Sequence, residues 1–448
     1  MDANGKGFSA LMYKGVNQKR YIMEKCSVSL RNIRIHNSFI VLFMALSLVG
    51  CKTDKGQPKG SETEQKVVYK KGSFGYDKAF LSGHYKDLVV LENGVSSVLV
   101  SPELQGRVMT STAGGDDGQS FGWINYDLIA SGESKEHFNP TGGEERFWLG
   151  PEGGQFSLYF KKGARFEFQD WYVPKELDTE PFSLVGSTKE EARFEREMKL
   201  ENYSGTIFNL LVQRTISLIG KDQASEELGV LIPDGVSMVG FASENSITNI
   251  GSQDWTKETG MPSIWILSML NSSDETTITI PFKKGSRSEL GKKVTDDYFG
   301  KVSQDRLKVM DSVLFFKADG QSRGKIGISP ERALPVLGSY DAKNKVLTIA
   351  KFSLPEGRTD YVNSLWEIQE QPFKGDAVNA YNDGPLEDGG QLGPFYELES
   401  SSPALALKSG ERDTHRHQTY HFIGDVKHLD VLSKEILGVP INEIEIKE

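Results

Sequence analysis

Two glutamates and three histidines at short, regular spacing lie near the end of the chain. Glu397 and Glu399 occur in FYELESSSP, and His415, His417 and His421 follow in THRHQTYHF. Alternate residues of a β-strand point to the same face, so we expect the two carboxylates to project together and the three imidazoles likewise. The KSGE sequence between them is typical of a turn, which predicts that the two segments pair as a hairpin or as neighbouring strands. Such a surface could transfer protons to and from a ligand.

The same pattern has plainer interpretations. A strand with one face in water also alternates polar and apolar residues. Neutral imidazoles together with a carboxylate can also bind zinc or a similar ion, so a metal site at His415, His417 and His421 is an alternative. The pattern by itself leaves these alternatives open.

A second stretch, residues 137–155, reads HFNPTGGEERFWLGPEGGQ. Its glycines and prolines predict a structured loop rather than a strand or helix. On such a loop Trp148 could stack on the apolar face of a sugar ring, Arg146 could donate a bidentate hydrogen bond, and Glu152 could accept from hydroxyl groups. His137 begins this stretch. The alternative is a demanding turn that packs Trp148 into the core and pairs Arg146 with a glutamate.

Composition limits the class of protein. The 448 residues carry a formal net charge of -10, with no basic stripe of the kind that binds phosphates, so no nucleic-acid partner is expected. Short alternating runs separated by glycine, asparagine and aspartate recur along the chain, among them 164–171, 208–219 and 276–281, which favours an all-β sandwich or barrel. The segment 425–437 is the strongest helix prediction.

The N-terminal part has the layout of a secretory signal. An uncharged apolar run, Phe39–Val49, follows several basic residues and ends in the sequence LVGC. This ending resembles a bacterial lipobox, in which the cysteine, here Cys51, becomes the lipidated first residue. Lys52 follows it, without the aspartate associated with inner-membrane retention, so we expect a lipid anchor in the bacterial outer membrane, facing the periplasm or the exterior. Translation could start at Met1 or Met23. The predicted divisions are a signal peptide at 1–50, a flexible tether at 51–66 and a folded domain at 67–448.

Three motifs together resemble the galactose mutarotase-like (aldose 1-epimerase) superfamily. They are LQGRV at Leu104–Val108, GGEERFWLGPE at Gly142–Glu152, and ELESSSP with the later KSGE and TYHF. The resemblance implies an all-β, galactose mutarotase-like β-supersandwich with few short helices and a groove that binds a carbohydrate. It also implies that Glu399, ahead of the proline, is the catalytic base.

This sequence departs from the family's pattern at the second catalytic group. In the family a histidine from the middle of the chain protonates the ring oxygen, but this sequence has no histidine between His137 and His415. His137, His415 or His417 could take that role from elsewhere in the fold. We therefore expect sugar epimerisation or anomerisation by glutamate and histidine; a non-catalytic carbohydrate-binding protein and a metal-assisted lyase or hydrolase are the alternatives. No cofactor beyond such a metal is expected. The candidate catalytic residues are Glu399, His415 and His417, and the candidate substrate-binding residues are Arg107, His137, Arg146, Trp148, Glu152 and Glu397.

Overall fold

The computed structural model describes residues 68–386 and 389–444. These residues belong to one compact unit, Lys66–Glu448. The predicted signal peptide, Cys51 and the tether lie outside the described residues. Within the described part of the chain, no helix is both long and apolar enough to cross a membrane.

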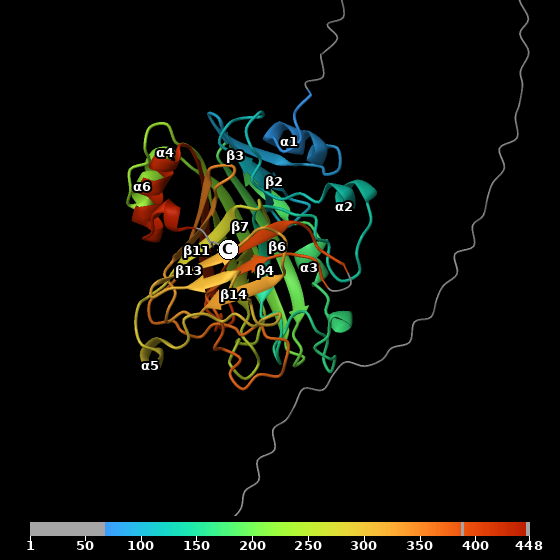
Figure 1. Cartoon of the computed structure of the whole chain (residues 1–448). Helices are drawn as coiled ribbons and strands as arrows, with labels where there is room; N and C mark the ends of the chain where they lie inside the picture. Colours follow the sequence, from blue (N-terminus) through green and yellow to red (C-terminus); the bar gives the residue numbers. More distant parts are fainter. Residues whose placement is uncertain (1–67, 387–388, 445–448) are drawn as a thin grey trace, which may run out of the picture. The chain divides into compact units, whose positions relative to one another are not determined.

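Strands dominate this unit and form three sheets (Figure 1), in which all strand pairs are antiparallel. A small sheet has the order β1-β2-β3, from Val89–Asn93, Ser96–Ser101 and Arg107–Thr112. A six-stranded sheet has the order β14-β17-β18-β9-β4, from Gly324–Ile328, Val378–Asn382, Phe395–Ser401, Ser263–Leu267 and Arg146–Gly150, with β10 (Leu270–Asn271) also paired to β18.

The third sheet has ten strands in the order β12-β13-β11-β15-β16-β19-β8-β7-β6-β5. Their bounds in that order are Leu307–Val309, Val313–Lys317, Thr276–Pro281, Val336–Asp341, Val346–Phe352, Arg412–Ile423, Ser237–Asn249, Ile207–Ile219, Glu191–Glu201 and Ser183–Ser187. The longest strands, β7 and β8, pair along most of their length. The predicted all-β class is therefore confirmed.

The helices are few and short. They are α1 (Phe74–Ser82), α2 (Tyr126–Ser131), α3 (Lys175–Asp178), α4 (Lys221–Leu228), α5 (Arg287–Leu290) and α6 (Val426–Leu437), with 3-10 turns η1 (Phe168–Asp170) and η2 (Ile441–Glu443). The helix predicted at 425–437 is confirmed as α6. It buries Leu429, Leu432 and Leu437, whose spacing places them on one face.

Apolar side chains cover both faces of the ten-stranded sheet. Helices α4 and α6 lie side by side in Figure 1 and share a core with Tyr420 and Phe422 of β19. The opposite face packs against the six-stranded sheet, where Tyr396 and Leu398 of β18 meet Leu337 of β15. Because alternate residues of a strand point to opposite faces, the odd-numbered residues of β18 are directed away from this second core.

Three expectations about secondary structure are wrong. The two C-terminal segments do not pair: β18 lies between β17 and β9, whereas β19 lies between β16 and β8 in the other sheet. The turn at KSGE connects two sheets instead of closing a hairpin. Residues 137–155 contain strand β4, and residues 164–171 contain η1 although their sequence alternates. There Phe166 stacks on Tyr203 and Phe168 packs against His137, and both partners lie outside the strands.

Candidate functional site

A cavity of about 890 Å³ lies against the face of the six-stranded sheet that is turned away from the ten-stranded sheet. Alternate residues of five strands point into it. They are Arg146 and Trp148 of β4, Trp265 and Leu267 of β9, Lys325 of β14, Asn379 and Tyr381 of β17, and Phe395 and Glu397 of β18. The period of two in each strand is what brings these side chains onto one surface. The cavity volume is typical of small-molecule sites in proteins.

Two buried ion pairs lie at the centre of this face. Arg146 Nη2 is 2.6 Å from Glu397 Oε1, and Lys325 Nζ is 2.9 Å from Glu399 Oε2. Trp265 Nε1 also donates to Glu399 Oε2, at 2.8 Å. The two carboxylates therefore project to the same face, as the spacing predicted, and each is held by a cation from a strand two places away in the sheet.

Several polar atoms of these pairs have no hydrogen-bond partner. They are Nε and Nη1 of Arg146 and Oε1 of Glu399. Arg146 is 2% exposed and lines the cavity, so its two unpartnered nitrogens belong to a buried group of the cavity wall. Glu399 has no exposed surface, and the side chains that hydrogen-bond it, Lys325 and Trp265, are the ones that line the cavity.

Burial and neighbouring charges change the pKa of Glu397 and of Lys325. Burial raises the pKa of Glu397 well above its ordinary value; Arg146 opposes the shift and the nearby charge of Glu399 adds to it. The pKa of Lys325 is also raised: burial opposes its charge, but Glu399 and Glu152 outweigh it. Lys325 therefore stays protonated, while Glu397 can carry a proton near neutral pH.

Another acidic group, Asp376, lies on the cavity wall. Asp376 Oδ2 accepts a hydrogen bond of 2.6 Å from the Tyr298 hydroxyl, which in turn accepts one of 3.2 Å from Asn379 Nδ2. All three residues line the cavity. Burial raises the pKa of Asp376 to about 6, although the hydrogen bond from Tyr298 works against that shift. The Asp376 carboxyl group can thus gain or lose a proton near pH 6.

Aromatic rings supply much of the remaining wall. Trp171 and Trp366 line the cavity and stack on each other with ring centres 5.9 Å apart. His137 also lines the cavity; it stacks on Tyr172 at 4.5 Å and its Nδ1 lies 2.7 Å from the Trp171 carbonyl oxygen. Together these rings offer apolar faces beside the charged groups of the sheet.

Trp148 and Glu152 line the cavity too. Trp148 is 4% exposed, and the guanidinium of Arg146 lies 4.8 Å above its ring. The second of the two alternatives for this stretch is thus what the structure shows: Trp148 packs in the core, and Arg146 pairs with a glutamate. Glu152 is partly buried, and burial raises its pKa, against the effect of Lys325.

The glycine pair ahead of β4 explains how that strand is placed. Gly142 and Gly143 have φ values of 96° and 116°, a region that favours glycine. A Cβ on Gly142 would lie 2.1 Å from the Trp123 carbonyl oxygen, and one on Gly143 would lie 2.4 Å from Arg107 Cδ. Arg107, the first candidate substrate-binding residue, donates to Gly142 O and Thr141 Oγ1. It is 1% exposed and does not line the cavity, so it supports this turn.

His415 and His417 lie elsewhere, inside the sandwich. Both are buried on β19, and both contact Ser400 Oγ, at 2.8 Å from His415 Nε2 and 2.9 Å from His417 Nδ1. Ser400 and Glu399 are consecutive on β18 and point to opposite faces, so the sheet separates these imidazoles from the cavity. Burial lowers the pKa of each histidine to about 3, which keeps both neutral.

His421 is also buried; its Nε2 is 2.7 Å from Glu144 Oε1 and its Nδ1 is 2.9 Å from Thr348 Oγ1. Among residues 68–386 and 389–444, no group of three or more histidine, cysteine, aspartate or glutamate side chains is placed to hold a metal ion. The metal alternative therefore gains no support from the described residues.

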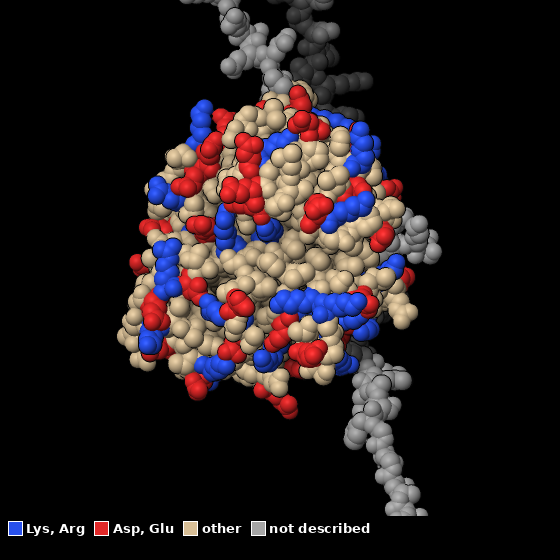
Figure 2. Space-filling model, turned by 90° about the vertical axis from the view of Figure 1, so that its left-hand side faces the viewer, with Lys and Arg blue, Asp and Glu red and all other residues tan. Residues whose placement is uncertain are grey.

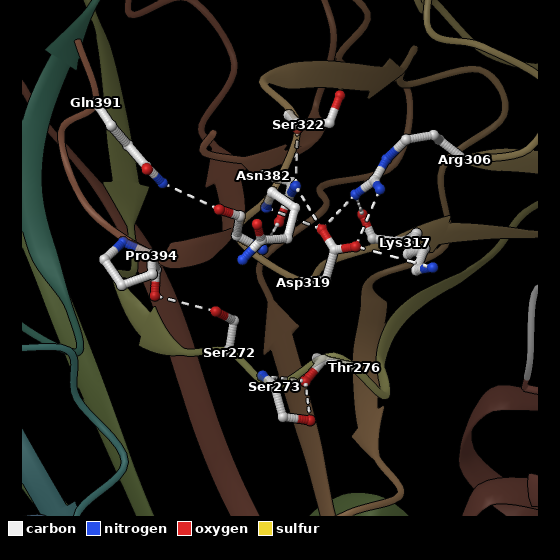
Figure 3. Close-up of polar contacts among 12 residues, drawn as sticks. Ser272, Ser273, Thr276, Arg306, Lys317, Asp319, Ser322, Asn382, Gln391 and Pro394 are labelled. Carbon is white, nitrogen blue, oxygen red and sulfur yellow. Dashed lines mark hydrogen bonds and ion pairs between the residues drawn. The ribbon is translucent and has the colours of Figure 1, made fainter. Parts of the chain in front are cut away.

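A polar network fixes two loops at the cavity (Figure 3). Arg306 pairs with both oxygens of Asp319, at 2.5 and 3.0 Å, and Asn382 binds the loop after Asp319 through Gly320 N and Ser322 O. Gln391 Nε2 donates to Gly320 O and so joins the second loop to the first. The first loop leads to Arg323, and both Arg323 and Gln391 line the cavity.

Comparison with known protein families gives one match, over residues 72–448, to a family of unknown function, DUF6786. The chain belongs to this family. A comparison with curated proteins found no match.

Solved structures similar to this DUF6786 chain include a proposed aldose 1-epimerase from Escherichia coli K12, at 11% identity over 75% of this chain and 98% of that one, with a TM-score of 0.45. A galactose mutarotase-like protein from Lactobacillus casei is similar at 11% identity over 75% and 99% of the two chains, with a TM-score of 0.43. The predicted resemblance to galactose mutarotase-like proteins thus reappears among solved structures. It is distant and does not bear on ligand or chemistry.

Sequence reasoning missed several cavity residues of the DUF6786 chain. Lys325, Asp376, Tyr298 and Arg323 were not candidates, yet all line the cavity. Arg323 directly precedes β14 and Lys325 lies on it, and their two-residue spacing places them on the same face. Charged residues at this spacing also occur on many solvated strands. Asp376 and Tyr298 lie outside the strands, where no periodic pattern marks them.

Proposed function

We propose that this chain is a lipid-anchored bacterial protein that binds a carbohydrate in the cavity on the six-stranded sheet. One observation carries the proposal: a cavity of about 890 Å³ that combines aromatic walls with buried, incompletely hydrogen-bonded charged groups.

Carbohydrates need both kinds of surface. The C–H face of a pyranose ring packs on aromatic rings, and its hydroxyl groups exchange hydrogen bonds with charged side chains held at fixed positions. Trp265 and Trp366 offer the rings, while Arg146, Lys325 and Glu397 offer the charges. Because the ion pairs already hold these side chains in place, little conformational freedom is lost when a ligand binds.

The test is a binding experiment with a panel of mono- and oligosaccharides, measured by calorimetry on wild-type protein and on Trp366→Ala. Trp366 is partly exposed and its loss leaves the two ion pairs intact, so the variant should fold and bind weakly or not at all. The matched control is Tyr76→Ala, at a partly exposed aromatic residue of α1 that does not line the cavity. No binding to any saccharide, or equal binding by wild type and Trp366→Ala, would reject the proposal.

A second candidate function is proton transfer on the bound sugar. Asp376 and Glu397 favour it, because both line the cavity and burial raises the pKa of each. One could act as acid and the other as base in ring opening of a hemiacetal. Glu399 would keep Lys325 in position instead of meeting the sugar. Exchange between the anomers of free sugars, followed by NMR, should be accelerated by wild type and lost in Asp376→Asn if this function exists. Binding without acceleration leaves carbohydrate binding as the function.

A further inference from the structure

Two arginines of the cavity, Arg146 and Arg323, have unused hydrogen-bonding capacity. Two of the three guanidinium nitrogens of Arg146 have no partner, although the residue is 2% exposed. Arg323 is in no ion pair with any residue in the described ranges; its guanidinium stacks on Phe299, 4.1 Å from the ring centre. Stacking of this kind holds the guanidinium plane in place and leaves its N–H edge free.

Several of the acidic side chains, by contrast, already accept hydrogen bonds from the protein. Arg146 donates to Glu397 and Tyr298 donates to Asp376. Asp383 accepts from the Tyr381 hydroxyl at 2.5 Å and from Gly393 N at 2.9 Å. Burial also raises the pKa of Asp383 above its ordinary value. These three carboxyl groups therefore have partners within the protein, whereas Nε and Nη1 of Arg146 do not.

We propose that the saccharide bound in this cavity is acidic, with anionic groups held by Arg323 at the rim and by the free nitrogens of Arg146 on the sheet. This inference rests on the proposed carbohydrate-binding function and narrows its ligand class. A planar carboxylate or a sulfate matches the paired N–H donors of a guanidinium, which a single sugar hydroxyl cannot do.

Arg146 and Arg323 bind the anionic groups in different surroundings. Arg146 is buried beside the rings of Phe138 and Trp148, so a charge-assisted hydrogen bond there is little weakened by water. Arg323 is exposed, so its contribution depends on salt. The network around Asp319 and Asn382 holds the loop that ends at Arg323, which keeps this arginine at the rim (Figure 3).

The experiment compares hexuronate trisaccharides, sulfated trisaccharides and neutral hexose trisaccharides of matched linkage, each titrated into the full-length chain by calorimetry. We expect one acidic set to bind about tenfold or more tightly than its neutral counterpart, the size of one charge-assisted hydrogen bond to a saccharide anion. The Arg323→Gln variant should reduce that preference and remove its salt dependence, whereas the part that Arg146 supports should remain.

The matched control is Arg193→Gln, an exposed arginine on β6 that does not line the cavity, and it should behave as wild type. Equal affinity for acidic and neutral sets, or a loss of both sets to the same extent in Arg323→Gln, would overturn the acidic-ligand inference and leave carbohydrate binding intact. If no set binds, carbohydrate binding itself fails and the inference fails with it. The hexuronate and sulfate arms decide which anionic group is recognised.

Discussion

The buried pair of Lys325 and Glu399 gives the sharpest prediction about stability. The side chains are 9% and 0% exposed and their charged atoms are 2.9 Å apart. In Lys325→Met the carboxylate of Glu399 keeps its hydrogen bond from Trp265 but loses its countercharge. Removing one partner of a buried ion pair typically costs about 3–5 kcal/mol, and because the tryptophan bond remains we expect a loss near the lower end.

The assay is unfolding of the full-length chain in urea, followed by tryptophan fluorescence, for wild type, Lys325→Met, Glu399→Gln and the double variant. The double variant removes both charges, so it should be more stable than Lys325→Met, with a coupling energy of roughly 1–3 kcal/mol between the two sites. Lys434→Met, at an exposed ion pair with Asp430, serves as the control and should change stability by less than about 1 kcal/mol. A small effect of Lys325→Met, or additivity within about 0.5 kcal/mol, would refute the reasoning.

Other substitutions test the glycine turn ahead of β4, the carboxyl group of Asp376 and the proposed lipid anchor at Cys51. Gly143→Ala should destabilise the fold by more than about 1 kcal/mol in the same assay, because φ is 116° and the added Cβ would collide with Arg107; Gly132→Ala, with φ of 65° and open space around it, should cost less. For Asp376, a pKa raised to about 6 from 3.8 means stability that is present below pH 4 and lost as pH rises through 6. Wild type should therefore lose up to about 3 kcal/mol over that window, and Asp376→Asn should show a flatter profile in urea unfolding at each pH; parallel profiles would contradict this. Cys51→Ser should abolish incorporation of a radiolabelled fatty acid and release the protein from membranes, whereas Cys26→Ser should leave both unchanged.

The sequence predicts part of this arrangement well. Strand alternation correctly placed Glu397 and Glu399 on one face, because that inference needs only the period of the strand. The glycine-rich stretch correctly marked Arg146 and its pairing with a glutamate as one alternative. The helix α6 followed from the spacing of its leucines.

The rest depends on long-range pairing. Whether β18 and β19 join one sheet or two is set by partners more than a hundred residues away, such as β8 and β9, which the local pattern does not reveal. Because β19 belongs to the ten-stranded sheet, His415 and His417 lie inside the sandwich and not at the cavity. The register between β14, β17 and β18 aligns Lys325 with Tyr381 and Glu397, which places its ammonium group within reach of Glu399 two residues further along β18. The local sequence of these strands does not indicate this contact.

The charge pattern of the surface agrees with the composition. On the face drawn in Figure 2, acidic and basic side chains are interspersed and no large area carries one sign. The chain's net charge of -10 is thus not gathered into a single patch on that face. Under the proposed function, the ligand is recognised by the charged groups of the cavity and not by a surface patch of one sign.

The central claim is that the cavity on the six-stranded sheet binds a saccharide. The most direct test is a crystal structure of the protein soaked with the tightest-binding saccharide of the panel. The account predicts sugar density inside the cavity, with a ring against Trp265 or Trp366 and a polar group within 3.2 Å, an ordinary hydrogen-bond distance, of Arg146 Nη1 or Nε. Sugar bound at another surface, with Arg146 still unpartnered, would contradict it.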